Sequence, residues 1–425
     1  MNTLTYETGN KSKGVVLHMV KKSERDVMVV SAARTPFGSF GGAMKDLPCL
    51  ELGVMAMEEV FRRLKRSNDM KKIVDELYFG TCILAENALE TNVLGRQAVL
   101  KAGLPPQVVS LSLDRACCSS LTALHLGYRS IKSGEADVVV AVGAENMSRT
   151  PHLAPGVRWG HRLGSVQLTD PIYALGYADW NPVSVDAGEV ALQYHVGRQE
   201  QDLWALNSQQ RYARAREEGK FIDEIFPVEI PQKKQSVTIK EDESPRPATT
   251  LEQLSRLSTI YGSPTVTPGN APGLNTGAAA IVLMSREKAE EMEVESLARV
   301  LSTAEVALEP HLIAAAPAPA VEKALERAGG LSLEQIDVIE INEAFAAMPL
   351  VSSKILAGGD TEKLERLREK INVNGGAIAV GHPVGASGAR IAMTMMYELR
   401  RRGGGLGVGA ICGGLAQADA VVLEV

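Results

Sequence analysis

Aromatic residues are scarce in this sequence, and their scarcity narrows the choice of fold. Phe, Trp and Tyr make up only 4% of the 425 residues, whereas Ala, Gly and Val are abundant. This composition favours closely packed parallel strands and helices over an aromatic-rich β-sandwich. A chain of this length is too long for a single hydrophobic core, so we expect two or three domains.

Positive charge and long apolar runs are lacking as well. The net charge is -6, which offers no basic field to a nucleic acid. No apolar run reaches the roughly 18 residues of a membrane-spanning helix. Residues 1–25 are polar and contain Lys, unlike a signal or transit peptide. We therefore expect a cytoplasmic protein with no membrane or nucleic-acid partner, and a flexible extension over residues 1–25.

Cysteine is too sparse and too scattered to form a disulfide framework. The cysteines are odd in number, and no two of them have the Cys-x-x-Cys spacing of a zinc or redox motif. Reduced thiols in a cytosolic protein are the better interpretation, and neither a metal nor a redox cofactor is indicated. The five residues are Cys49, Cys82, Cys117, Cys118 and Cys412.

Short apolar runs rich in Val and Ile alternate with helical patterns in two stretches of the chain. Such alternation predicts βαβ units and a mainly parallel sheet of the α/β class. In the first stretch we expect strands at 27–31, 76–80, 108–113, 137–143 and 278–284 and helices at 51–65, 95–102 and 119–133. In the second we expect strands at 338–341, 406–411 and 418–424 and helices at 319–328, 344–356 and 386–402.

The segment 147–266 breaks this rhythm with Pro, Trp, Gly and scattered charges, and contains one expected helix at 186–219. We interpret it as a loop domain inserted over the functional site. The remaining chain then divides into a first half, 26–146 with 267–295, and a second half, 296–425. Both halves have the same alternating style, which indicates a duplicated fold.

Cys117 lies where the strand expected at 108–113 meets the helix expected at 119–133. The N–H groups and partial positive charge of a helix N-terminus stabilise a thiolate, lower its pKa and can hold an oxyanion. Core packing is the alternative for any cysteine, and we favour it for the adjacent Cys118. For Cys117 we favour a nucleophile that carries an acyl group as a thioester.

His382 lies between Gly381 and Pro383 in a glycine-rich loop that leads into an expected helix. Glycine permits close backbone approach and proline fixes the turn, so the imidazole is placed to serve as a base. A phosphate-cradling loop is the rival interpretation. The loop lacks the Lys-Ser/Thr end of a P-loop, and it follows no clear strand, as a dinucleotide fingerprint would.

Cys412 comes at the end of the strand expected at 406–411, and Asn342 follows the strand expected at 338–341. Gly413 and Gly414 come after Cys412, whose thiol can deliver a proton to a carbanion or a leaving thiolate while a glycine N–H binds an oxyanion. A buried cysteine at a strand end is the alternative. Asn342 precedes a helical pattern, so it either caps that helix or holds a water that polarises a carbonyl.

Together these motifs resemble the thiolase family over nearly the whole chain. The supporting stretches are those around the four residues Cys117, Asn342, His382 and Cys412 and the segments 31–38, 143–148, 219–221, 245–247 and 269–271. Four ordered motifs at thiolase-like separations make the resemblance specific. It implies a duplicated five-layered α-β-α-β-α fold with an inserted loop domain, in a homodimer or homotetramer.

The resemblance also implies a role for each residue of the site. Cys117 is the nucleophile that becomes acylated, and Cys412 is the acid and base that moves the α-proton of the second acyl group. His382 takes the proton of Cys117 and forms one oxyanion hole with a water oriented by Asn342. The backbone N–H groups of Cys117 and Gly414 form the other oxyanion hole.

Contacts to CoA are implied at Arg246, near the nucleotide, and at Ala344 and Phe345, along the pantetheine tunnel. The catalytic four are retained, whereas several positions expected to touch the acyl group or pantetheine are changed, which leaves acetyl specificity open. The departures from the family pattern are Asp114, Cys118, 182–184, Pro272 and 313–316.

The activity implied is thiolytic cleavage of 3-oxoacyl-CoA or the reverse Claisen condensation of two acyl-CoA units, as in fatty acid metabolism. CoA is a substrate, and no cofactor or metal is implied. One alternative is a ketosynthase that uses carrier-protein thioesters, but such enzymes have one cysteine, and both Cys412 and the Asn342 block speak against it. The other is a non-catalytic subunit that binds or channels acyl-CoA, which loss of a catalytic residue would signal.

Overall fold

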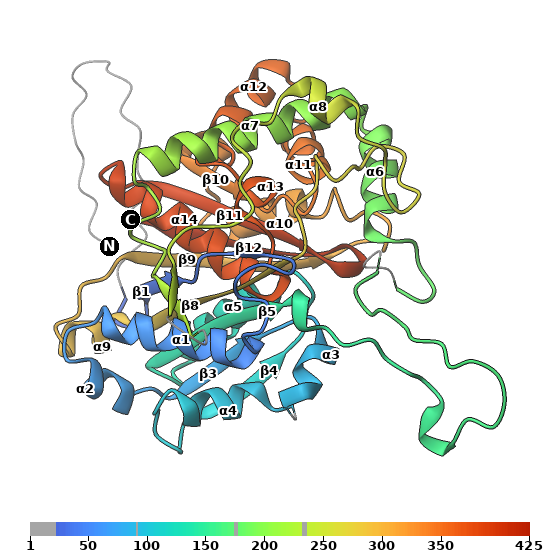
Figure 1. The fold of residues 1–425 in the computed structure, drawn as a ribbon. Coiled ribbons are helices and arrows are strands. Elements are labelled where there is room, and N and C mark those ends of the chain that lie inside the picture. Colours follow the sequence, from blue (N-terminus) through green and yellow to red (C-terminus); the bar gives the residue numbers. More distant parts are fainter. Residues whose placement is uncertain (1–22, 91, 174–176, 232–235) are drawn as a thin grey trace, which may run out of the picture.

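The structure is a computed structural model that describes residues 23–90, 92–173, 177–231 and 236–425 (Figure 1). Most of the extension expected at 1–25 therefore lies outside the described residues. No helix in these ranges is both long enough and apolar enough to cross a bilayer.

Alternating strands and helices build the first half, as the apolar periodicity predicts. Strands β1 (Val27–Arg34), β5 (Val138–Asn146) and β8 (Asn275–Ser285) are buried at every residue, which explains their continuous apolar runs. The other elements are β2 (Gly38–Ser39), α1 (Cys49–Arg62), α2 (Ser67–Lys72), β3 (Glu76–Gly80), α3 (Leu84–Asn87), α4 (Leu94–Lys101), β4 (Val109–Leu113), α5 (Ser119–Ser133) and α9 (Arg286–Glu291).

The second half repeats this pattern with a shorter set of strands. Its elements are β9 (Ala298–Ala307), α10 (Pro317–Arg327), β10 (Val338–Ile341), α11 (Ala347–Ala357), α12 (Thr361–Lys370), α13 (Ala377–Val380), α14 (Ser387–Arg401), β11 (Leu406–Gly413) and β12 (Gln417–Glu424). The bounds expected for β3, α5 and β10 are confirmed to the residue. The helix α12 is mostly polar and buries only Leu367, and the sequence patterns did not predict it.

The described elements stack in five layers, which confirms the expected architecture (Figure 1). Helices α5 and α14 pack against each other in the central layer, α5 on β3 and β5 and α14 on β10 and β11. Helix α1 covers the outer face of the first half, and α10 covers the outer face of the second. Because α14 lies between the strands of the first half and those of the second, residues 387–399 are buried all round it.

The strands of the two halves form one ten-stranded mixed sheet. Their order is β10-β11-β12-β9-β1-β8-β5-β3-β4, and β2 pairs with β8. Parallel pairing is found in β3–β4, β3–β5 and β10–β11, whereas the remaining pairs of this sheet are antiparallel. The expectation of a mainly parallel sheet is therefore wrong. The short turn Gly414–Ala416 joins β11 to β12, and so short a connection joins only antiparallel strands.

The two halves are related by duplication. The order β4-β3-β5-β8-β1 in the first half corresponds to β10-β11-β12-β9 in the second, and the isolated parallel bridge between Ile339 and Ile371 takes the place of β4. The turn before α5 therefore corresponds to the loop before α14. This correspondence places the Cys117 turn and the His382 loop at equivalent positions.

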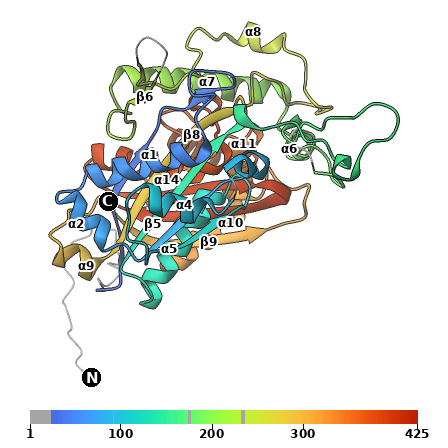
Figure 2. The ribbon, with the colours of Figure 1, turned by 60° about the horizontal axis from the view of Figure 1, so that its bottom comes forward.

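The segment between β5 and β8 crosses one end of the layered core, where α7 and α8 are seen in both views (Figures 1 and 2). Its elements are α6 (Val183–Gln193), α7 (Arg198–Glu217), β6 (Val228–Ile230), β7 (Val237–Ile239) and α8 (Leu251–Ser255). The single helix expected at 186–219 is wrong. The chain breaks between α6 and α7 because His195 has a φ of 55° and Gly197 follows it.

A buried arginine fixes this segment to the core. Arg34, at the end of β1, lies 2.8 Å from a carboxylate oxygen of Glu224 and 2.7 Å from one of Asp242. Tyr212 of α7 donates a further hydrogen bond to Asp242 at 3.0 Å. Removing one partner of a buried ion pair leaves an uncompensated charge, so these contacts set the position of the segment over the site.

Candidate active site

Cys117 lies in a tight turn between β4 and α5, at the junction that the sequence predicts. Ala116 has a left-handed backbone with φ 50°, a strained conformation that its surroundings must hold. The Arg115 N–H donates to Ser119 Oγ at 2.9 Å, and Ser119 Oγ donates to the Ala116 carbonyl at 2.6 Å. Asp114 Oδ1 accepts the Ala116 N–H at 2.8 Å, a role that needs only an acceptor oxygen.

The Cys117 turn packs against the end of β11, where Cys412 lies. Cys118 is buried in the core, as expected, and its thiol donates to the Ile411 carbonyl at 3.4 Å. A Cβ atom on Gly413 would lie 3.0 Å from Cys118 Sγ. A Cβ atom on Gly414, which follows Cys412 and Gly413, would lie 3.3 Å from the side chain of Ala116, the residue before Cys117. The structure thus brings Cys117 and Cys412 together.

The glycine-rich loop carries His382 over the end of β5. A Cβ atom on Gly143 would overlap the carbonyl oxygen of Gly385, so this close crossing requires glycine at the end of the strand. The Gly385 N–H donates to Glu145 Oε2 at 3.0 Å. The helix that follows the loop packs on α5, whose first turn comes directly after Cys117.

The hydrogen bonds of His382 define which ring nitrogen is free. Ser387 Oγ donates its proton to the Pro383 carbonyl at 2.9 Å, so it accepts from His382 Nδ1 at 2.6 Å. Nε2 is therefore the unprotonated nitrogen, and it is buried with no hydrogen-bond partner among the described residues. Burial, and then the charge of Arg390, lower the pKa of His382 to about 3. A neutral imidazole with a free Nε2 is a general base.

Asn342 lies beside Cys412, at the end of β10. Its N–H donates to the Ala410 carbonyl at 3.0 Å, and its Oδ1 accepts from Arg390 at 3.1 Å. Its Nδ2 is buried and has no partner in the described chain, so it is available to a ligand or a water. The capping interpretation is wrong, because α11 begins only at Ala347 and has no side-chain cap.

Both thiols are protonated in the resting site. Burial raises the pKa of Cys412 to about 12 and raises that of Cys117 well above its usual range. The expectation that the start of α5 lowers the pKa of Cys117 is wrong here, since desolvation outweighs it. A nucleophilic role for Cys117 therefore requires a neighbouring base that takes its proton.

Apolar side chains surround the Cys117 thiol and make an acyl-compatible environment. They come from the start of α3, the end of β5, the segment before α6, the His382 loop and the start of β8. The buried members are Ile83, Met147, Ile172 and Val384, with Cys82, Cys117 and Leu274 packed against them. A hydrocarbon chain bound to the sulfur would be desolvated by these residues.

The sequence patterns missed two buried carboxylates that hold the site together. Glu145 accepts the N–H groups of Cys82 and Ile83 at 2.9 and 3.0 Å, besides that of Gly385. Burial, partly offset by these hydrogen bonds, raises the pKa of Glu145 to about 7. Its signal in the sequence is an acidic residue that ends a long apolar run.

The second carboxylate is Glu343, which ties the Asn342 segment to α7. It accepts from Trp204 Nε1 at 2.9 Å, Ser208 Oγ at 2.8 Å and Asn372 Nδ2 at 2.9 Å. A fourth bond comes from the Ile378 N–H at 3.1 Å. Four donors hold this carboxylate, so it positions the strand end instead of reacting.

The residues expected to contact CoA are not gathered around the two thiols. Arg246 is exposed in the segment over the core, where its N–H donates to Gln209 Oε1 at 2.7 Å. Ala344 and Phe345 are buried in the core cluster of the second half. Within the described ranges, no group of three or more His, Cys, Asp or Glu side chains is placed to hold a metal ion.

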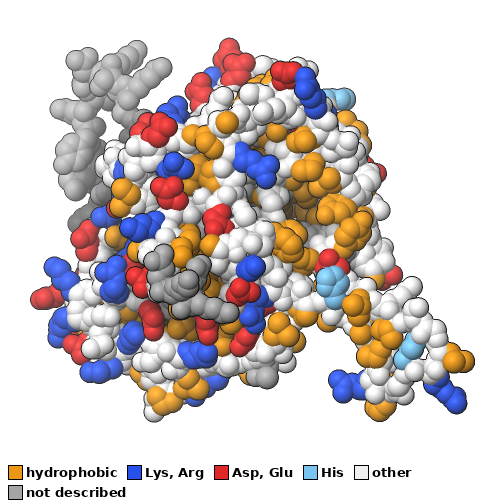
Figure 3. Space-filling view, viewed as in Figure 1, with side chains coloured by type: hydrophobic (Ala, Val, Ile, Leu, Met, Phe, Trp, Pro, Cys, Tyr) orange, Lys and Arg blue, Asp and Glu red, His pale blue; other side chains and the backbone are white. Residues whose placement is uncertain are grey.

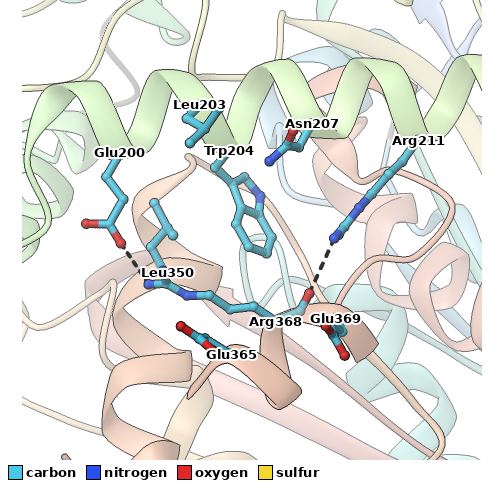
Figure 4. A pocket seen from close by; sticks show the side chains of 9 residues that line it. All are labelled: Glu200, Leu203, Trp204, Asn207, Arg211, Leu350, Glu365, Arg368 and Glu369. Atoms are coloured by element: carbon cyan, nitrogen blue, oxygen red, sulfur yellow. Dashed lines mark hydrogen bonds and ion pairs between the residues drawn. The ribbon is translucent and has the colours of Figure 1, made fainter. Parts of the chain in front are cut away.

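A hollow on the outside of α7 is separate from this site. It has a volume of about 360 Å³ and lies between α7 and α12, with an ion pair of Glu200 and Arg368 at 2.8 Å across it (Figure 4). Arg211 donates to the Arg368 carbonyl at 3.4 Å on its other side. None of the nine lining residues is one of the expected catalytic residues, so this hollow is not the centre of the chemistry.

Comparison with known proteins gives two family matches that cover most of the chain. The family model described as "Thiolase, N-terminal domain" matches residues 27–287, and that described as "Thiolase, C-terminal domain" matches residues 294–425.

Among individual proteins, an acetyl-CoA acetyltransferase of Syntrophomonas wolfei is 40% identical over 94% of this chain and 99% of its own length. A rat protein named "Acetyl-CoA acetyltransferase, cytosolic" is also 40% identical, over 93% of this chain and 98% of its own. The crystal structure of human mitochondrial 3-ketoacyl-CoA thiolase superposes with a TM-score of 0.87 at 36% identity, covering 94% of this chain and 99% of that one. A second structure of the human enzyme, in complex with CoA, superposes with a TM-score of 0.86.

Proposed function

Because the chain belongs to the thiolase family, we propose how its residues carry out acyl transfer between CoA thioesters. The protein is an acyltransferase with CoA-dependent thiolase activity. The single observation that carries the residue assignment is the packing of the Cys117 turn against the end of β11, where Cys412 lies, together with two unpartnered polar atoms of the described chain, His382 Nε2 and Asn342 Nδ2. The ketosynthase and non-catalytic alternatives find no support among the relatives.

In the first step of cleavage, His382 Nε2 takes the proton of Cys117, and the sulfur attacks the 3-keto carbon of a 3-oxoacyl-CoA. The oxygen of that carbon becomes an oxyanion, which backbone N–H groups of Cys117 and Gly414 are placed to bind. The bond between C2 and C3 then breaks. The acyl group stays on Cys117, and the departing acetyl-CoA enolate takes a proton at C2 from Cys412.

In the second step, Cys412 recovers its proton from the thiol of CoA, and the CoA thiolate attacks the acyl-Cys117 thioester. The product is an acyl-CoA shortened by two carbons, and the proton on His382 returns to Cys117. The enolate oxygen of the first step is held by His382 and by a water on Asn342 Nδ2. Condensation of two acyl-CoA units is the same path in reverse.

For the substrate we propose CoA thioesters bound across the inserted segment. Arg246 is exposed there without a side-chain partner among the described residues, which suits a CoA phosphate. Ala344 and Phe345 lie one turn beyond Asn342, where the pantetheine arm would pass. Acetoacetyl-CoA is the first substrate to test, since the relatives include acetyl-CoA acetyltransferases. A place in fatty acid metabolism follows from the same chemistry.

For the assembly we propose a homodimer through β4, or a dimer of such dimers. Strand β4 is at the end of the sheet, and its Val109 and Leu111 are 69% and 48% exposed. An exposed apolar edge strand is a template for pairing with another chain. The arm after β5 carries Trp159 and Leu163 at 90% and 91% exposure, with Lys or Arg beside the hydrophobic side chains (Figure 3). This arm suits contact between dimers. Sedimentation analysis of Val109→Lys tests the interface through β4.

For location we propose the cytoplasm, by analogy with the rat relative named as cytosolic.

For the domain division we propose a first half of 26–146 with 267–295, a loop domain of 147–266 and a second half of 296–425. Limited proteolysis tests the division, because exposed connections between units are cut first.

The deciding experiment is intact-protein and peptide mass spectrometry after incubation with acetyl-CoA or acetoacetyl-CoA. We expect one acetyl adduct on the peptide that contains Cys117, and no adduct in Cys117→Ala. An adduct on another residue, or none, would contradict the proposal. Acylation by an acyl carrier protein thioester but not by acyl-CoA would favour a ketosynthase.

A further inference from the structure

Tyr177 lies at the catalytic thiols, although no part of the expected machinery includes it. It follows β5 in the segment that leads to α6, and the Trp180 N–H donates to its carbonyl at 3.0 Å. Burial raises the pKa of its phenol, and the proximity of Cys117, Cys82, Asp114 and Cys412, whose ionised forms are negative, raises it further. The phenol is therefore uncharged, and Cys82 and Cys117, which pack against the apolar cluster, are also near it.

The end of the Tyr177 ring touches the expected oxyanion hole directly. A Cβ atom on Gly414 would overlap Tyr177 Oη, so the phenol oxygen is in van der Waals contact with the Gly414 backbone. The same Cβ atom would lie 3.3 Å from the side chain of Ala116, the residue before the nucleophile. Tyr177 thus ends between the Cys117 turn and the end of β11.

A second side chain of the same segment closes on the nucleophile from another direction. Ile172 is 6% exposed and belongs to the apolar cluster against which Cys117 packs. The described parts of this segment therefore reach Cys117 with one aliphatic and one aromatic side chain. By contrast, Tyr173 of this segment is 70% exposed and stacks edge-on with Tyr261 at a centroid distance of 5.4 Å.

We propose that Tyr177 limits the length of the acyl group that Cys117 can carry, and so restricts the enzyme to acetyl-sized units. This inference rests on the proposed acyl-Cys117 intermediate. A thioester carbonyl bound beside Gly414 brings the rest of its acyl group against the phenol ring, which occupies that space. Each added methylene has to displace the ring, and one methylene in a closed pocket changes kcat/KM by about 10- to 200-fold.

The ring is the limiting element, more than its hydroxyl group. Tyr177 Oη makes no hydrogen bond to any described residue, so no network fixes the phenol by its oxygen. Tyr177→Phe retains the ring and tests the hydroxyl, whereas Tyr177→Ala removes both. Tyr173→Ala removes an exposed tyrosine of the same segment and is the matched control.

The experiment measures kcat/KM for cleavage of acetoacetyl-CoA and 3-oxooctanoyl-CoA by the full chain. In the unaltered enzyme we expect kcat/KM to fall at least about 10-fold from the shorter to the longer substrate. Tyr177→Ala should raise the ratio of longer to shorter at least about 10-fold. In Tyr177→Phe and Tyr173→Ala the ratio should stay within about 3-fold of the unaltered enzyme, below the effect of one methylene.

Other outcomes overturn the proposal. A flat chain-length profile in the unaltered enzyme rejects it, as does an unchanged ratio in a Tyr177→Ala enzyme that still acylates Cys117. An increase in Tyr177→Phe as large as in Tyr177→Ala assigns the effect to the hydroxyl group and also rejects it. Tyr177→Leu replaces the alanine variant if that one fails to fold. Absence of any acyl-Cys117 in the unaltered enzyme rejects the proposed function itself, which separates the two failures.

Discussion

The two halves of this molecule end their parallel strands in different ways. In the first half, Thr81 directly follows β3 and Glu145 lies near the end of β5, where three backbone N–H groups hold it at 2.9 to 3.0 Å. In the second half, Asn342 directly follows β10 and Cys412 lies near the end of β11, and Asn342 Nδ2 has no partner among the described residues. Equivalent positions thus carry satisfied groups in one half and unsatisfied groups in the other.

This difference shows how a duplicated fold divides one reaction. Buried polar groups that are fully hydrogen-bonded rigidify a structure, whereas buried unpaired groups are costly unless they serve a ligand. In the proposed mechanism the first half supplies the nucleophile, and its Glu145 holds two loops. In the same proposal the second half supplies the groups that exchange protons and polarise carbonyls. Substitutions at equivalent positions should therefore have unequal effects.

The largest contrast is expected between two buried cysteines, one in each half. Cys412→Ala should reduce the rate of acetoacetyl-CoA cleavage by about 10²- to 10⁴-fold, because a proton donor and acceptor is lost. The acetyl adduct on Cys117 should still form from acetyl-CoA. Cys49→Ala removes a buried thiol of the first half, and its rate should stay within a factor of about 3. Equal losses of cleavage rate in the two variants would contradict this difference between the halves.

The strand ends Asn342 and Thr81 offer a second contrast. Asn342→Ala removes the free Nδ2 and should lower kcat by about 10²- to 10³-fold, as for loss of one oxyanion donor. Thr81→Val removes a hydroxyl that accepts from Asn87 at 3.0 Å, and should affect stability more than kcat. Steady-state kinetics and urea denaturation of both variants check this division. A kcat loss in Thr81→Val equal to that in Asn342→Ala would place chemistry in both halves.

A smaller effect is expected on stability at Glu145. Glu145→Gln places an amide opposite three N–H donors and should lower the free energy of unfolding by about 1–3 kcal/mol. Burial raises the pKa of Glu145 from 4.5 to about 7, so between these pH values the folded state binds more protons than the unfolded state. The contribution of Glu145 to stability therefore falls as pH rises through this range. Urea denaturation at pH 5 and pH 7 should show a weaker fall in the glutamine variant.

The smallest effect is expected when the pH is lowered, because His382 stays neutral. With a pKa lowered to about 3, the imidazole stays neutral between pH 5 and pH 7. The rate constant for acylation of Cys117 should then change by less than about 3-fold over this range. An imidazole of ordinary pKa would lose roughly 20-fold of its neutral form. Rapid-quench mass spectrometry at constant ionic strength measures this rate, and a loss of that size would contradict a neutral resting site.

Local sequence patterns predicted most elements of the fold, and they failed for identifiable reasons. Elements β3, α5 and β10 have the expected bounds because their apolar periodicity is strong and their ends coincide with turn residues. The direction of the strands was wrong because the antiparallel neighbours of β8 and β12 depend on contacts far apart in the chain. The break near His195 was missed because a left-handed residue has no reliable sequence signal.

For the candidate site, the sequence indicated which residues to examine but not how they interact. Cys117, His382, Cys412 and Asn342 were selected from residue type and from position at strand and loop ends, and their roles remain a proposal. Glu145, Glu343 and Tyr177 were missed, because each acts through contacts to segments remote in sequence. The expected lowering of the Cys117 pKa was wrong, since burial cannot be judged from a local motif.

The amino-acid sequence by itself determined the chemical inventory: two thiols, an imidazole and an amide, each at a junction of regular structure. It also determined the layered α/β class, because the spacing of apolar residues specifies strands and helices locally. Only the tertiary structure decided that the Cys117 turn packs on the strand end that carries Cys412, that His382 Nε2 is the free nitrogen and that Tyr177 contacts Gly414. The physical reason is that proton affinity and available space depend on neighbouring atoms, and folding brings those neighbours from distant parts of the chain.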